Sequence, residues 1–228
     1  MLCSACGAVQ SPPPGTDHFA VLGLPAHPAV DEKTLSDRYY ELSRRVHPDR
    51  FQAADPRELE QAVSATAALN SAFRSLRDVE SRGRYWLERD GGSLARDNAA
   101  VPPALAATVF EVQEKLDELR RSSGDARDGV RGEVDRTRED LARRREDRRV
   151  ALEAMLRAWP GRDGSLGTKP EGASGAGGAH SRAPAKGDAC ASGAPTGALR
   201  GQAELKALLS ELSYLRTLER DVRAALES

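Results

Sequence analysis

The chain has 228 residues, and its 34 basic and 35 acidic side chains give a formal net charge of −1. This length has room for one or two small domains, and the balanced charge provides no global field that would favour nucleic acid or a membrane surface as a partner. No apolar stretch approaches the roughly 20 residues that a membrane-spanning helix needs, and residues 1–10 lack the pattern of a secretory signal.

Residues 1–16 are expected to form a flexible tail, which ends in a run of prolines. Cys3 and Cys6 have the Cys-x-x-Cys spacing of half a tetrahedral zinc site, but the tail contains no second pair of ligands. The pair is therefore a remnant or a half-site that another chain completes, and we expect no cofactor unless Cys3 and Cys6 bind zinc. The odd total of 3 cysteines argues against a disulfide framework, so we expect a cytoplasmic protein.

Residues 17–90 predict a helical unit whose central part is a hairpin of two amphipathic helices. Asp17 and Asp31 are expected to cap the first two helices, and Gly23 to end the short first one. Apolar side chains recur at helical spacing before and after residues 47–49, at Leu35, Tyr39, Leu42 and Val46 and then at Ala62, Thr66, Leu69, Phe73 and Leu76. His47-Pro48-Asp49 therefore lies on the loop of the hairpin, where proline ends the first helix and stiffens the tip. Such a tip predicts a docking surface rather than a pocket.

Residues 102–160 and 199–228 predict a three-helix antiparallel bundle, since none of the three helices can bury its apolar stripe alone. The stripe of the first helix is Leu105, Val109, Val112, Leu116 and Leu119. That of the second is Val130, Val134, Leu141, Leu152, Met155 and Trp159. That of the last is Leu205, Leu208, Leu209, Leu212, Leu215, Val222 and Leu226. Arg144, Arg145 and Arg148 interrupt the second stripe, so either their stems lie along the surface or the helix separates there. Between the second and third helices, residues 161–198 are mostly Gly, Ala, Ser and Pro, which predicts a disordered insertion.

The outward side of the first bundle helix carries an aromatic side chain among acids. Phe110 falls opposite the apolar stripe, together with Ala107, Glu111, Glu114 and Glu118. On the last helix, Tyr214 is expected to face away from the leucine seam. An apolar anchor with a polar rim is typical of a small protein interface, although isolated exposed aromatics also occur on ordinary surfaces.

Residues 17–90 resemble a J-domain, through the short first helix, Leu22-Gly23-Leu24, the paired helices and the His-Pro-Asp loop. The resemblance implies that the chain docks onto a DnaK/HscA-type chaperone ATPase and stimulates ATP hydrolysis. Asp49 would meet a cation on the chaperone, Pro48 would fix the loop, and His47 would position it. Arg38, Arg44, Arg45 and Arg50 supply cations near the tip, in a pattern that differs from general J-domains and suggests a specialised chaperone. A catalytic His–Asp pair is disfavoured, because no nucleophile in a recognisable context accompanies it.

Four segments resemble the HscB family of iron–sulfur co-chaperones, at residues 67–78, 84–87, 111–119 and 212–219. The family implies an all-α protein without enzymatic activity, whose bundle carries an IscU-type iron–sulfur scaffold to the chaperone. Phe110 and Tyr214 match the family's scaffold-binding face, and we expect Ala106, Ala107, Glu111, Glu114 and Glu118 to belong to the same site. Ala106 and Ala107 stand where the family often has large apolar residues, which predicts less contact area. The alternatives are a general J-domain protein with another client and a metal or thiol enzyme centred on Cys3 and Cys6.

Overall fold

The structure is a computed structural model that describes residues 1–2, 8–52, 54–94, 101–160 and 196–227. Its elements, in chain order, are α1 (His18–Leu22), α2 (Glu32–Val46), the 3₁₀ turn η1 (Pro48–Phe51), α3 (Pro56–Arg77), α4 (Val79–Arg89), the 3₁₀ turn η2 (Pro103–Leu105), α5 (Ala106–Arg121), α6 (Asp125–Arg157) and α7 (Thr196–Glu227). Over the described ranges there is no strand, apart from one isolated bridge between Leu2 and Val9. The predicted all-helical fold is confirmed, with α7 beginning before the expected Gln202.

Aspartates begin the helices of the N-terminal unit. The side chains of Asp17 and Asp31 accept backbone hydrogen bonds from the first turns of α1 and α2, as predicted. Asp55 and Asp78 do the same for α3 and α4. Gly23 ends α1 in the left-handed conformation, with φ 65°, which a residue with a Cβ adopts at a cost. Local sequence therefore sets where each of these helices begins.

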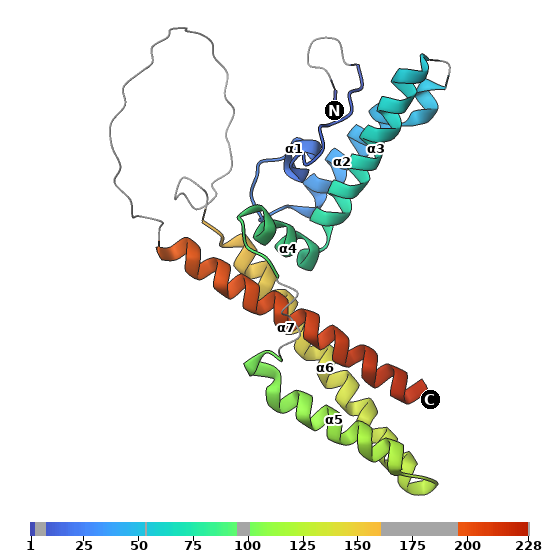
Figure 1. Cartoon of the computed structure of the whole chain (residues 1–228), viewed down its shortest axis with the longest axis vertical. Coiled ribbons are helices and arrows are strands. Elements are labelled where there is room, and N and C mark those ends of the chain that lie inside the picture. Colours follow the sequence, from blue (N-terminus) through green and yellow to red (C-terminus); the bar gives the residue numbers. More distant parts are fainter. Residues whose placement is uncertain (3–7, 53, 95–100, 161–195, 228) are drawn as a thin grey trace.

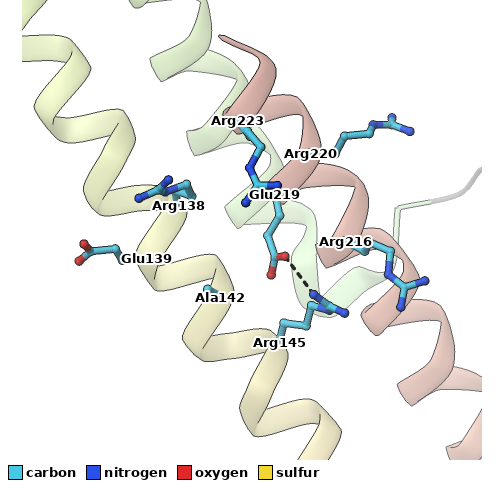
Figure 2. Close-up of a pocket in the computed structure, with 8 residues that line it drawn as sticks. All are labelled: Arg138, Glu139, Ala142, Arg145, Arg216, Glu219, Arg220 and Arg223. Carbon is cyan, nitrogen blue, oxygen red and sulfur yellow. Dashed lines mark hydrogen bonds and ion pairs between the residues drawn. The ribbon is translucent and has the colours of Figure 1, made fainter. Parts of the chain in front are cut away.

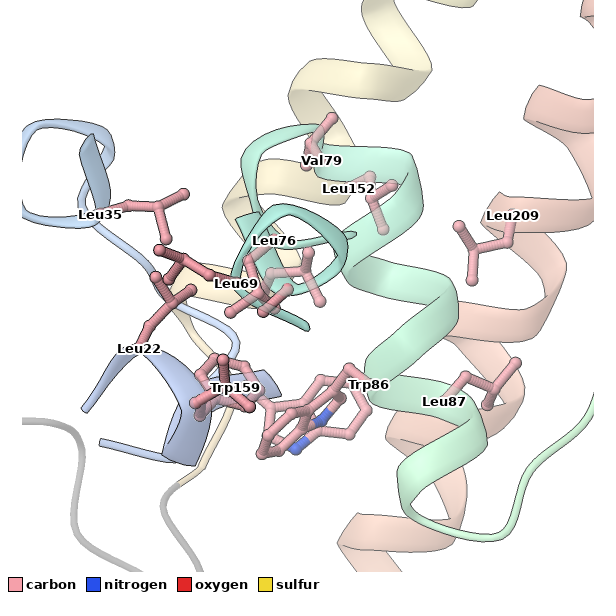
Figure 3. Packing of buried hydrophobic residues seen from close by; sticks show 14 of the residues in the cluster. Leu22, Leu35, Leu69, Leu76, Val79, Trp86, Leu87, Leu152, Trp159 and Leu209 are labelled. Atoms are coloured by element: carbon pink, nitrogen blue, oxygen red, sulfur yellow. The ribbon is translucent and has the colours of Figure 1, made fainter. Parts of the chain in front are cut away.

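The first hydrophobic core is formed by side chains of α1, α2, α3 and α4. α2 and α3 make the hairpin, and α1 and α4 pack near the end of the hairpin opposite its loop (Figure 1). Leu35, Leu69 and Leu76 are fully buried in it, and the partly buried Tyr39 stacks on Phe73 with ring centroids 4.1 Å apart. The first core also receives side chains from the upper ends of α6 and α7, which are Leu152, Leu156, Trp159, Leu205, Leu209 and Leu212 (Figure 3).

The second core lies between α5 and the lower halves of α6 and α7. It contains the predicted stripe nearly complete: Leu105 of η2 and Val112, Leu116 and Leu119 of α5 are buried, and Val109 is half-buried. The facing residues are Val134 and Leu141 from α6 and Leu215, Leu218 and Val222 from α7. The α6 stripe is thus divided between two cores, since Val134 and Leu141 pack against α5 whereas Leu152 and Leu156 pack on the N-terminal unit.

Two of the three arginines that interrupt the α6 stripe, Arg145 and Arg148, bind acids on neighbouring helices, and Arg144 donates to the Thr108 hydroxyl of α5 over 2.6 Å. Arg145 donates to Glu219 of α7 over 3.2 Å and to Glu80 of α4 over 3.3 Å. Arg148 pairs with Glu211 of α7 at 3.0 Å. Around Arg145 and Arg148, ion pairs therefore replace apolar contacts, and α6 stays packed on α7 rather than separating from it.

The junction between α4 and the α6–α7 pair is close-packed. A Cβ on Gly83 would lie 3.3 Å from Leu209 Cδ2 and 3.5 Å from Leu152 Cδ1, so the missing side chain lets three helices approach. Beside Gly83, the rings of Trp86 and Trp159 pack edge to face, with their centroids 6.3 Å apart (Figure 3). None of the helices that the structure describes is long and apolar enough to cross a bilayer.

Candidate functional site

The His-Pro-Asp tripeptide projects from the far end of the α2–α3 hairpin. α2 ends at Val46, whose backbone carbonyl accepts a 3.2 Å hydrogen bond from the Thr66 hydroxyl of α3. His47 has an extended backbone, and Pro48 opens the η1 turn, where its missing N–H costs nothing. Phe51, at the end of η1, packs against the first core. The tip is therefore anchored on both sides, which confirms its predicted place on the hairpin loop.

Polar contacts hold the loop in one shape while its carboxylate faces solvent. The backbone N–H of Asp49 donates to His47 Nδ1 over 3.3 Å, and the Asp49 carboxylate lies 3.4 Å from the same nitrogen. Arg50 donates to the backbone carbonyl of Arg44 over 3.0 Å. The side chain of Asp49 is nevertheless 73% exposed, so its charge is free to meet a cation on another molecule.

The four predicted docking arginines surround this loop unevenly. Arg44, Arg45 and Arg50 are exposed near the tip, whereas Arg38 is half-buried. Arg38 binds Glu41 at 2.7 Å and its guanidinium lies beside Gly23, which places it toward the base of the hairpin. One exposed aromatic was not among the predicted sites: Tyr40 of α2 is 59% exposed. Its position outside the Leu35/Tyr39/Leu42 stripe is the signal that could have identified it.

A second surface lies on the outer side of α5. Phe110 is 71% exposed, the most of any large apolar side chain in the described part of the chain. All its predicted neighbours on α5 are exposed as well: Ala106, Ala107, Glu111, Glu114 and Glu118. The structure therefore exposes all of these residues on α5, one aromatic ring and three carboxylates among them.

Tyr214 departs from the prediction. It is half-buried and packs against the second core instead of facing away from the leucine seam. The reason is that α7 contacts α4, α5 and α6, so these helices cover a wider band of α7 than its leucines alone. Its part in binding a scaffold stays a prediction.

No group of three or more metal-binding side chains occurs among the described residues. Cys3 and Cys6, the predicted zinc half-site, lie outside those residues, as does most of the predicted disordered insertion at 161–198. Zinc binding at the two cysteines stays a prediction.

Known proteins resemble the chain in sequence and in fold. A co-chaperone protein HscB homolog from Bordetella parapertussis is 37% identical over 123 residues, which are 54% of this chain and 72% of that protein. Co-chaperone protein HscB from Proteus mirabilis is 32% identical over 108 residues, covering 47% of this chain and 62% of the relative. No family model matches the chain.

Two solved structures share the fold. Chaperone HscB from Vibrio cholerae superposes with a TM-score of 0.55 at 17% identity, covering 91% of this chain and 96% of that one. Human co-chaperone protein HscB superposes with a TM-score of 0.58 at 18% identity, covering 98% of this chain and 88% of the human protein.

Proposed function

Because this chain belongs to the HscB family of co-chaperones, we propose that it binds an IscU-type iron–sulfur scaffold, delivers it to an HscA/DnaK-type chaperone and stimulates that chaperone's ATPase. As a member of this family the chain is a co-chaperone rather than an enzyme. The observation that carries the proposal is the pairing of two exposed, preformed surfaces on one chain. One is the Asp49 tip, and the other is the outer face of α5 around Phe110.

The proposed chaperone contact follows from the loop geometry. His47 and Pro48 hold the backbone so that the Asp49 carboxylate projects beyond the hairpin, where it forms a charge-assisted hydrogen bond with a cation of the chaperone. The nearby Arg44, Arg45 and Arg50 attract an acidic surface and speed the encounter. Stimulation then comes from the chaperone conformation that this contact selects.

The proposed scaffold contact uses Phe110 as its anchor. Burying an exposed aromatic ring against an apolar pocket gives a small interface most of its binding free energy. The carboxylates of Glu111, Glu114 and Glu118 form a rim that selects a basic partner surface. Ala106 and Ala107 keep the face shallow, so Phe110 dominates the contact. The sequence predicts that this exchange takes place in the cytoplasm.

Calorimetry with a purified IscU-type scaffold tests the second contact. We expect Phe110→Ala to weaken binding by at least about tenfold, which is about 1.4 kcal/mol. Val150→Ala is the matched control, because Val150 is also an exposed apolar residue of the bundle, at 60%, but lies on α6. Equal binding by the wild type and Phe110→Ala would remove the α5 face from the proposal.

Steady-state ATPase assays with an HscA-type chaperone test the first contact. Asp49→Asn should abolish stimulation while leaving scaffold binding unchanged, because the tip and α5 belong to different cores. Asp90→Asn, in an exposed residue at the far end of α4, should stimulate like the wild type. ATPase stimulation without any scaffold binding would instead favour a general J-domain protein with another client.

A further inference from the structure

α6 and α7 form a groove of about 520 Å³ that no residue of α5 lines. Figure 2 shows it in front of the two helices, with α5 behind them. Arg138 of α6 and Arg216, Arg220 and Arg223 of α7 provide most of its charge, and Glu139 and Glu219 are its acids. The groove is therefore a strongly basic surface on a chain whose net charge is −1.

The basic character follows from helical periodicity on both walls. On α6, Arg138 and Arg145 are seven residues apart, which places them on one face, and Arg131 continues the row one step earlier. On α7, the arginines at 216, 220 and 223 have the spacing i, i+4, i+7 of a single face. A second hollow of about 430 Å³ shares Arg138 and Arg223 and reaches Arg131, but Asp128, Asp135 and Glu227 also line it. The excess of arginines over acids therefore belongs to the first groove.

The protein uses only part of this charge for its own packing. Arg145 and Arg216 bind Glu80 of α4, and Arg138 binds Asp135 one turn away. Among the described residues, Arg220 pairs only with the adjacent Asp221, and its side chain is 74% exposed. The exposed Arg223 guanidinium has no hydrogen-bond or ion-pair partner among the described residues. On the α7 wall, the Arg223 guanidinium therefore remains available to another molecule, and the Arg220 guanidinium is exposed but already pairs with Asp221.

The chemistry of the lining selects the class of ligand. Guanidinium groups bind carboxylates through paired hydrogen bonds, and a row of them at helical spacing fits carboxylates at the same spacing. No aromatic side chain lines the groove, so it offers nothing on which nucleic-acid bases could stack. The two glutamates also break the positive charge into separate positions, which suits spaced carboxylates better than a continuous phosphate chain.

We propose that this groove is a third docking surface, which binds a segment rich in Asp and Glu from a partner protein. The segment lies between α6 and α7 and pairs chiefly with Arg220 and Arg223. Because α5 lies on the other side of these helices, the groove and the Phe110 face accept partners at the same time. The proposal does not depend on the scaffold contact on α5.

Fluorescence anisotropy on the full chain tests it, with a labelled helical peptide that carries glutamate at every third or fourth position. We expect binding at low salt that weakens as salt rises, because the contacting charges are exposed. The double variant Arg220→Gln/Arg223→Gln should weaken binding at least about tenfold. Arg157→Gln/Arg200→Gln is the matched control, since it removes two exposed arginines from the same helices outside the groove.

Several results would overturn the proposal. Equal losses in the groove and control variants would reduce the binding to unspecific attraction, and a glutamine version of the peptide that binds as well would exclude carboxylate recognition. A single-stranded oligonucleotide that binds more tightly and depends on Arg220 and Arg223 would assign the groove to nucleic acid. Self-association lost in the groove variant would assign it to a second copy of the chain. Scaffold calorimetry on the groove variant should match the wild type and so separates this test from that of the α5 face.

Discussion

Glu80 is the residue that links the two parts of the molecule most directly. Its side chain is only 3% exposed, although it is a carboxylate on the first turn of α4. Arg145 of α6 and Arg216 of α7 donate to its two oxygens over 3.3 and 2.7 Å, and Arg149 lies 4.0 Å away. Buried charges persist only when they are paired, so Glu80 depends on the helices that it joins.

Replacing Glu80 with glutamine should lower the free energy of unfolding by about 1 to 3 kcal/mol, because two arginines lose their charged acceptor in a buried setting. Urea denaturation followed by circular dichroism measures the loss. Glu88→Gln, on the exposed side of α4, is the control and should change stability by less than about 0.5 kcal/mol. Matching values for the two variants would show that the Glu80 cluster adds nothing.

The contact between α1 and α4 should make stability depend on pH. Burial alone would raise the pKa of the Asp17 carboxyl, but hydrogen bonds from Tyr85 and the Phe19 N–H, with the charge of Arg89, hold that pKa below its ordinary value. Burial lowers the pKa of His18, whose ring stacks on Tyr85 at 4.3 Å, against an opposing effect of Asp17.

Both shifts make acid destabilising. The unfolded chain takes up a proton at His18 near pH 6.5 and the folded chain only at lower pH, so stability falls modestly as pH drops below 6.5. The contribution of Asp17 is present above the unfolded value of 3.8 and is lost as pH falls through the lower folded pKa. Urea titrations at successive pH values should show the free energy of unfolding fall twice, once below pH 6.5 and again at the lower pKa of Asp17. The His18→Phe variant should lack the fall below pH 6.5 and retain the ring contact with Tyr85. An unchanged fall below pH 6.5 in that variant would assign it to another group.

At the scale of elements, helical spacing predicted what depends on one helix and its nearest turns. The position of His47-Pro48-Asp49, the buried stripe of α5 and the exposed ring of Phe110 all follow from periodicity and helix-ending residues. Partners distant in sequence did not follow, because Glu80 meets Arg145 and Arg216 only after α4 docks on α6 and α7. For the same reason, spacing alone missed the burial of Tyr214 and the division of the α6 stripe between two cores.

The close approach of α4 to α6 and α7 depends on Gly83, which gives a test at this scale. Gly83→Val would push side-chain methyls into Leu152 and Leu209, so we expect a loss of about 1 to 3 kcal/mol in the free energy of unfolding. Gly132→Val on α6 is the matched change, because nothing lies within 4 Å of a Cβ built there. Chemical denaturation of both variants measures the difference. A stable Gly83→Val protein would mean that the three helices separate at little cost.

For the whole molecule, the decisive feature is that α6 and α7 run through both cores (Figure 1). α6 has 33 residues and is therefore about 50 Å long. Its lower half packs on α5 below the Phe110 face, and its upper half packs on the unit that carries the Asp49 tip. A continuous helix of this kind resists bending, so the two proposed partners are held at a fixed separation.

This shared architecture predicts a single cooperative unfolding transition rather than one for each core. The chain has 2 tryptophans, and both Trp86 and Trp159 are buried where α4 meets the end of α6. Tryptophan fluorescence therefore reports the junction, while circular dichroism reports all helices. The two urea curves should coincide in the wild type, because opening the junction exposes apolar surface of α6 and α7 on which the second core also depends. In Gly83→Val both curves should move to lower urea together, because the weakened junction holds both cores. Two separate transitions in the wild type would instead mean that the tip and the α5 face move independently.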